Sequence, residues 1–183
     1  MSMTSTNAKT PTAAAEPLVT MAITTAHGEF TARYSANGLA QLSFPTAFTS
    51  MRDATPAPSH LRPQISAWHR ITAKALKRAL LGQEPDGLPP LDVADGTPFQ
   101  RSVWRALQGI PTGKTASYGE LARSLGRPKA VRALGGACGA NPIPVLIPCH
   151  RVLAANRKLG GFSGGLKWKR TLLAAEGTDI GNG

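Results

Sequence analysis

Hydrophobic and polar positions follow a strand-like pattern near the start of the chain. The three apolar runs are residues 18–24, 29–34 and 39–44. His27-Gly28 and Asn37-Gly38 fall between them, and pairs of this kind favour tight hairpin turns. The pattern therefore predicts a small antiparallel sheet.

A helical period replaces this pattern further along. In residues 62–82 the apolar positions are spaced for one buried helix face, and Gly82 marks the end of the helix. A connection containing proline and serine, residues 52–60, precedes it. Residues 84–96 hold three prolines and predict either a linker or an extended crossover.

Two capping boxes mark helix starts in the second half. Thr97 stands three residues before Gln100, and Ser117 stands three before Glu120. The first helix carries apolar residues every four positions, and the second is short, with Gly126 as its C-terminal cap. A third helix is predicted from Pro128 to about residue 140.

The second and third helices, with the glycine turn between them, are a helix-turn-helix candidate. Such pairs also occur as plain structural hairpins. The third helix contains Gly135, Gly136 and Gly139, and each costs about 0.8–1 kcal/mol relative to alanine. Close approach of a neighbouring helix or of a DNA strand explains this composition. Basic residues on and before the helix (Arg127, Lys129 and Arg132) favour DNA.

These elements predict an α/β (α+β) protein, with a small N-terminal antiparallel sheet and helix followed by a mainly helical part. We expect a disordered tail at residues 1–16 because they are rich in threonine, alanine and serine. An N-terminal α/β supporting domain is expected at 17–92, and a mainly helical domain that carries the DNA-binding candidate is expected at 93–183.

The chain of 183 residues carries a net charge of +11, and this charge is unevenly placed. Residues 1–98 hold 8 basic and 7 acidic residues, whereas residues 99–183 hold 13 basic and 3 acidic residues. A basic half of this kind favours a polyanion, nucleic acid first, although a merely soluble basic surface has the same charge.

Composition also bears on location and on metals. No segment is long and apolar enough to span a membrane, and the N-terminus lacks the apolar core of a secretory signal. We therefore expect a cytoplasmic protein whose two cysteines, Cys138 and Cys149, are free thiols. They show no metal-ligand spacing with the four histidines, so no metal site is predicted.

Cys149 is the candidate nucleophile. Three prolines within residues 141–148 predict an extended, rigid approach to it. His150 and Arg151 follow directly, and basic neighbours favour the reactive thiolate. On an extended segment His150 points away from Cys149, so it acts through one water, with Glu176 holding its ring. A cysteine protease is the rival, but it has no need of a basic half.

Several stretches resemble the O6-alkylguanine-DNA alkyltransferases, or methylated-DNA–protein-cysteine methyltransferases. Pro148-Cys149-His150-Arg151-Val152 is similar to their active-site signature. The other matches occur in the family's order and cover residues 96–176 almost continuously: 96–100 with 103–104, 117–118, 128–133, 141–142 and 160–166. The N-terminal portion resembles the family only in layout.

The resemblance implies a role for each matching residue. The implied catalytic residues are Cys149, His150, Glu176, Tyr118 and Asn141. The implied DNA-binding residues are Arg127, Lys129, Arg132, Ala133, Gly135, Gly136 and Arg151, with the glycine-rich helix in the minor groove and Arg132 entering the duplex. The implied base pocket is lined by Tyr118, Pro144, Val152, Phe162, Ser163 and Gly164. Phe162 departs from the family pattern, since many relatives carry tyrosine there.

The implied activity is DNA repair by a methylated-DNA–protein-cysteine S-methyltransferase. The protein flips O6-alkylguanine out of double-stranded DNA and transfers the alkyl group irreversibly to Cys149. A monomer without metal or organic cofactor is implied, and the structural zinc of some relatives is not expected because no cysteine precedes Cys138. The alternatives are a non-catalytic DNA-damage-binding or regulatory protein on the same fold, and a thiol hydrolase.

Overall fold

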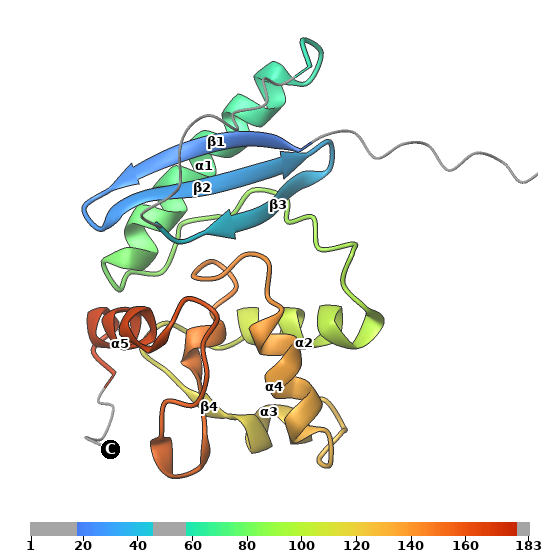
Figure 1. The fold of residues 1–183 in the computed structure, drawn as a ribbon, viewed down its shortest axis with the longest axis vertical. Helices are drawn as coiled ribbons and strands as arrows, with labels where there is room; N and C mark the ends of the chain where they lie inside the picture. The colour runs from blue at the N-terminus through green and yellow to red at the C-terminus, as the bar shows by residue number, and fades with distance from the viewer. Residues whose placement is uncertain (1–17, 46–57, 179–183) are drawn as a thin grey trace, which may run out of the picture.

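Residues 18–45 and 58–178 are described by the computed structural model of the chain, which runs from a sheet with one long helix to a cluster of short helices (Figure 1). The tail predicted at 1–16 lies outside the described residues, as does most of the connection predicted at 52–60. The mixed α/β architecture confirms the predicted fold class.

The N-terminal sheet has three antiparallel strands in the order β1-β2-β3. They are β1 (Val19–Thr25), β2 (Gly28–Ser35) and β3 (Gly38–Ser43). Side chains alternate along β2, so that Phe30, Ala32 and Tyr34 are fully buried. The predicted strands and both hairpins are confirmed.

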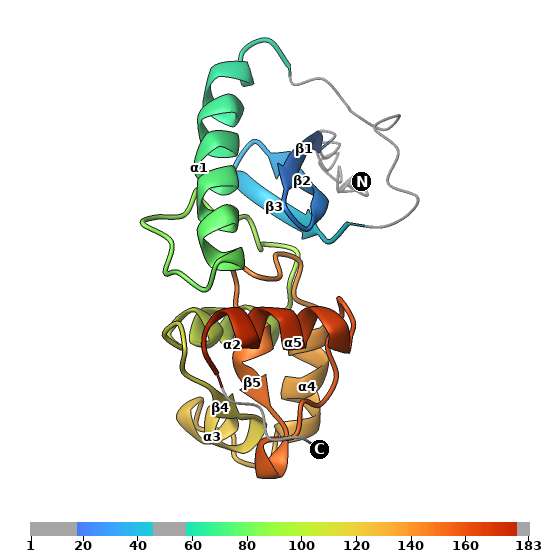
Figure 2. The same ribbon diagram turned by 90° about the vertical axis from the view of Figure 1, so that its left-hand side faces the viewer.

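Helix α1 (Arg62–Leu80) covers one face of this sheet (Figure 2). Its buried face includes Ile65, Trp68 and Leu76, the apolar positions of the helical period. The helix ends at Leu80, and Gly82 follows with a φ of 71°. The predicted helix is confirmed.

The proline-containing stretch after α1 is an extended crossover. Leu39 N donates to Pro90 O at 2.8 Å, and Asp92 N donates to Leu39 O at 2.8 Å. These hydrogen bonds cover part of the free edge of β3, where unpaired backbone groups would otherwise face water.

The C-terminal part contains α2 (Pro98–Gln108), α3 (Tyr118–Ser124), α4 (Val131–Gly139) and α5 (Leu166–Ala175). Both capping boxes are present as predicted. Helix α4 begins later than predicted. Ala130 N donates to Arg127 O at 2.9 Å, so Pro128 lies inside a turn and the helix starts at Val131.

Two very short strands bring the middle of this part together. Strand β4 (Ala116–Ser117) pairs in parallel with β5 (Val152–Leu153). The pair places the start of α3 beside the chain that leaves Cys149. A strand of two residues has no periodicity to detect, so the sequence did not predict it.

Candidate active site

The segment that leads to Cys149 is folded by the Asn141 side chain. Asn141 Oδ1 accepts from Ile143 N at 3.0 Å, and Asn141 Nδ2 donates to Ile147 O at 2.8 Å. Ile147 N donates to Ile143 O at 2.9 Å, and Val145 has a φ of 74°. The prediction of an extended approach was therefore wrong, because the buried amide closes residues 143–147 into a turn.

Cys149 begins a single 3-10 turn, Cys149–Arg151, and is 3% exposed. Asn141 Nδ2 also donates to Cys149 Sγ at 3.1 Å. Burial raises the pKa of the Cys149 thiol, although the hydrogen bond from Asn141 and the positive charge of Lys169 oppose this. The resting group is therefore a protonated thiol that needs a base.

His150 and Glu176 form the contact that the sequence predicted. His150 Nε2 lies 2.9 Å from Glu176 Oε1, and both side chains are almost fully buried. A carboxylate only accepts, so Nε2 carries the proton and Nδ1 keeps a free lone pair. No described residue gives Nδ1 a hydrogen bond. Burial lowers the pKa of His150 despite Glu176, and the ring is a neutral base at pH 7.

Arg151 is not available to DNA, and its predicted DNA contact is wrong. The side chain is buried, and its Nε donates to both carboxylate oxygens of Glu176 at 3.1 Å. Burial would raise the pKa of Glu176, but the hydrogen bonds from His150 and Arg151 outweigh it and hold the pKa below its ordinary value. Arg151 thus fixes the carboxylate that orients His150.

A pocket of about 460 Å³ opens onto Cys149. Its lining residues are Tyr118, Val131, Gly135, Cys138, Gly139, Cys149, Gly161, Phe162 and Ser163. Three predicted lining residues are not among them. Val152 is fully buried behind the site, Pro144 is buried in the turn, and Gly164 faces Phe44 instead.

Tyr118 stands at the start of α3 and lines the pocket. Burial raises the pKa of Tyr118 to about 12, with further contributions from the charges of Cys138 and Cys149. Its hydroxyl therefore stays protonated at neutral pH and is a hydrogen-bond donor into the pocket.

The pocket wall at Phe162 is packed from behind by the N-terminal part. The rings of Phe44 and Phe162 are 5.8 Å apart between centroids, and Phe44 also contacts Trp168 of α5. A Cβ on Gly164 would lie 2.4 Å from the Phe44 ring, so only glycine fits there. The sequence did not predict this contact between the two halves of the chain.

Lys169 is a site residue that the sequence did not predict. It is fully buried on α5, and its Nζ donates to the carbonyls of Val152, at 2.7 Å, and Leu159. Burial lowers the pKa of Lys169 to about 8, so the ammonium form still dominates at pH 7. The spacing of Lys169 with buried Leu172 and Leu173 is the signal that could have placed it on the inner face of its helix.

Helix α4 presents its small residues outward next to the pocket. A Cβ on Gly136 or Gly139 would meet no described atom within 4 Å. The sequence left two explanations for the glycines, close approach of a neighbouring helix or of a DNA strand. At Gly136 and Gly139 no described helix comes close, so the first explanation does not apply there. Arg132 and Ala133 are exposed on the same helix, as are Arg127 and Lys129 in the turn before it.

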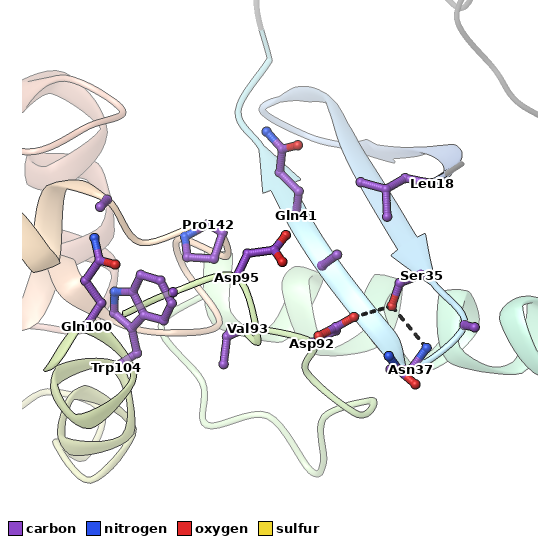
Figure 3. A pocket seen from close by; sticks show the side chains of 14 residues that line it. Leu18, Ser35, Asn37, Gln41, Asp92, Val93, Asp95, Gln100, Trp104 and Pro142 are labelled. Carbon is purple, nitrogen blue, oxygen red and sulfur yellow. Dashed lines mark hydrogen bonds between the residues drawn. The ribbon is translucent and has the colours of Figure 1, made fainter. Parts of the chain in front are cut away.

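A second hollow, of about 610 Å³, lies between the β2–β3 hairpin and α2 (Figure 3). Asp92 and Asp95 line it, and Ser35 donates a hydrogen bond of 2.5 Å to Asp92. It contains no cysteine or histidine, and its carboxylates repel phosphate. The pocket that contains Cys149 is therefore the better candidate for the active site.

The described ranges also bear on metals and membranes. Within residues 18–45 and 58–178, no three side chains of His, Cys, Asp or Glu gather as metal ligands would. None of the helices placed in these ranges combines the length and the apolar character that crossing a bilayer requires. Cys138 and Cys149 are both free thiols, as predicted.

The fold and site define a class of protein: a pocket lined by a cysteine lies beside an exposed, glycine-rich helix, and the histidine that follows the cysteine is paired with a buried glutamate. Comparison of the sequence and fold with known proteins identifies the family within this class. Residues 98–178 match the family described as "6-O-methylguanine DNA methyltransferase, DNA binding domain". The structure of Mycobacterium tuberculosis O6-methylguanine methyltransferase superposes with a TM-score of 0.67 at 33% identity, covering 87% of this chain and 92% of that one.

A second solved structure, Mycobacterium tuberculosis OGT in complex with DNA, has a TM-score of 0.63 at 38% identity, covering 85% of this chain and 90% of that one. A methylated-DNA–protein-cysteine methyltransferase of Mycolicibacterium paratuberculosis is 59% identical over 81 residues, 44% of this chain and 49% of that protein. The sequence match thus spans about half the length of that relative. The chain belongs to the O6-methylguanine DNA methyltransferase family.

Proposed function

We propose that this protein repairs DNA by transferring an alkyl group from the O6 atom of guanine to its own Cys149. One observation carries the proposal: the Cys149 thiol lines a pocket beside an exposed helix, and His150, the next residue in the chain, is paired with Glu176. The names of the similar proteins agree with this activity.

The reaction requires Cys149 as a thiolate, and His150 is the base that removes the thiol proton. The proton leaves Cys149 Sγ and passes through one water to His150 Nδ1, and the imidazolium is stabilised by Glu176. Sγ then forms a bond to the alkyl carbon while the bond from that carbon to O6 breaks. The departing guanine keeps the electron pair, and the Tyr118 hydroxyl donates to a ring nitrogen as charge builds there.

Burial of the thiol favours its protonated form in the free protein. The raised pKa of Cys149 keeps the sulfur protonated, and the pocket limits access to it. The product is a thioether, which is a poor leaving group. Each molecule is therefore expected to act once.

The partner we propose is double-stranded DNA that contains O6-alkylguanine. The target atom lies within the base stack, so the nucleotide must rotate into the pocket. Small exposed residues on α4 fit the minor groove, which is about 6 Å wide, and Arg132 replaces the flipped base. We propose that the protein acts as a monomer in the cytoplasm.

Intact-mass measurement tests the proposed function directly. The protein is mixed with a duplex that contains one O6-methylguanine, and the modified peptide is mapped. We expect one methyl group per protein, on Cys149. Bound DNA with unmodified protein would favour the non-catalytic alternative, and repeated turnover would favour a hydrolase.

Arg132→Ala is expected to slow methyl transfer from duplex DNA by about tenfold or more, since the flipped state loses the side chain that fills its gap. Transfer from free O6-methylguanine base should change little, because no duplex is opened. Arg70→Ala, which removes an exposed charge from α1, is the control for net charge. Equal effects of Arg132→Ala on both substrates would contradict this role.

A further inference from the structure

The loop after α1 lies against the end of α5, where Glu176 caps that helix (Figures 1 and 2). A Cβ on Gly82 would lie 1.9 Å from Ala175 O, and Gly82 has a φ of 71°. Only glycine satisfies both conditions. The N-terminal part is therefore fitted closely to the backbone next to Glu176.

Two residues further on, Glu84 reaches the C-terminal part. Its Oε2 accepts hydrogen bonds from the Thr112 hydroxyl and from Thr112 N, the latter at 3.3 Å. Arg78 Nε donates to Glu84 O at 2.9 Å and ties the loop back to α1. Glu84 is thus held at its backbone by one half of the chain and at its carboxylate by the other.

The Thr112 hydroxyl also faces inward. It accepts from Arg151 Nη2 at 2.8 Å, while the same guanidinium binds Glu176. Gly113 N donates to Glu176 Oε2 at 3.2 Å. One hydroxyl therefore donates to Glu84 and accepts from Arg151, and hydrogen bonds arranged in series strengthen one another.

We infer that Thr112 and Glu84 are positioning residues, through which the N-terminal part holds Arg151 and Glu176 in the geometry that orients His150. This inference rests on the proposed function. It gives the N-terminal part a task in the reaction beyond support. Neither residue touches the alkyl group or Cys149, so they act only through the Arg151–Glu176 pair.

Thr112→Val and Thr112→Ser form a matched pair for the test. Valine removes the hydroxyl with little change in shape, and serine keeps it. We expect valine to slow methyl transfer from an O6-methylguanine duplex by about five- to tenfold, since a hydrogen bond to a charged group is lost. Serine should stay within about twofold of the native rate, and both variants should bind DNA as the native protein does.

A readout without DNA separates this inference from the proposed function. Iodoacetamide alkylates a thiolate with loss of iodide, so its rate at Cys149 against pH reports how well His150 is placed. The charged groups that act on His150 are Glu176, Arg151 and Lys169, and the Thr112 variants leave all three in place. We expect the profile of Thr112→Val to shift while that of Thr112→Ser does not.

The inference would be overturned if Thr112→Val and Thr112→Ser both kept the native methyl-transfer rate and the native pH profile of alkylation. It would also be overturned if both variants lost the same fraction of the methyl-transfer rate. If Thr112→Val does not fold, Glu84→Ala and Glu84→Gln carry the test, because glutamine keeps an acceptor oxygen. Alanine should then be slower than glutamine, and equal rates would overturn the inference. Failure of the native protein to accept methyl from DNA, with the iodoacetamide contrast intact, would refute the proposed function alone.

Discussion

Replacing Cys149 with alanine is expected to abolish methyl transfer while leaving the affinity for DNA within about twofold of the native value. The sulfur is the atom that forms the new bond, and His150 and Tyr118 cannot substitute for it in this pocket. The thiol is buried, with 3% of the residue exposed, whereas Arg132 and Gly136 of α4 are exposed. Its removal therefore leaves the proposed DNA surface unchanged.

Cys138 is the residue that could take over, because it lines the same pocket. Burial raises the pKa of Cys138 to about 12. Burial is the largest cause of this shift and is still present when Cys149 is replaced, so the Cys138 thiol stays protonated at pH 7. We therefore expect no methyl group on Cys138 in the Cys149→Ala variant.

Two measurements check this prediction. Intact mass after exposure to an O6-methylguanine duplex should be unchanged in the variant, and titration of labelled DNA should give a native dissociation constant. The native protein, mapped in parallel, should carry its methyl on Cys149 alone. Loss of DNA binding in the variant, or a methyl group on Cys138, would show that the site is misassigned.

The features that the sequence predicted depend on local interactions. Hairpin turns, capping boxes and the apolar face of α1 each involve residues that are close in the chain. The His150–Glu176 contact is an exception that could still be predicted. Only three acidic residues follow position 98, and Glu176 stands at the end of a segment whose apolar residues follow a helical period.

The features that the sequence did not predict depend on packing between distant segments. The family resemblance implied a DNA contact for Arg151, but its side chain is held inside by Ile110, Thr112 and Glu176. Similarly, the turn before Cys149 requires the Asn141 amide, although three prolines alone favour an extended chain. Lys169 was missed because a fully buried lysine is rare.

Replacing Glu176 with alanine is expected to damage both stability and chemistry. The Arg151 guanidinium would remain buried without its carboxylate, and breaking a buried pair costs about 3–5 kcal/mol. His150 would lose the group that holds its tautomer, so methyl transfer should slow by about tenfold or more. Urea unfolding at pH 7 and single-turnover rates measure the two effects.

The pH dependence of stability tests the charge of the Glu176 carboxylate, because acid removes that charge and leaves the side chain in place. The pKa of Glu176 is lowered in the folded protein, so its stabilisation is fully present above the unfolded value, near pH 4.5, and is lost as pH falls through the folded value. The native protein should therefore lose stability below about pH 4.5, and Glu176→Ala should lose less over the same range. Asp86→Ala, which removes an exposed carboxylate, serves as the control and should keep native stability at pH 7. If Glu176→Ala matched the native protein in stability at pH 7 and in its acid response, the carboxylate would not hold Arg151 and His150 as the structure places them.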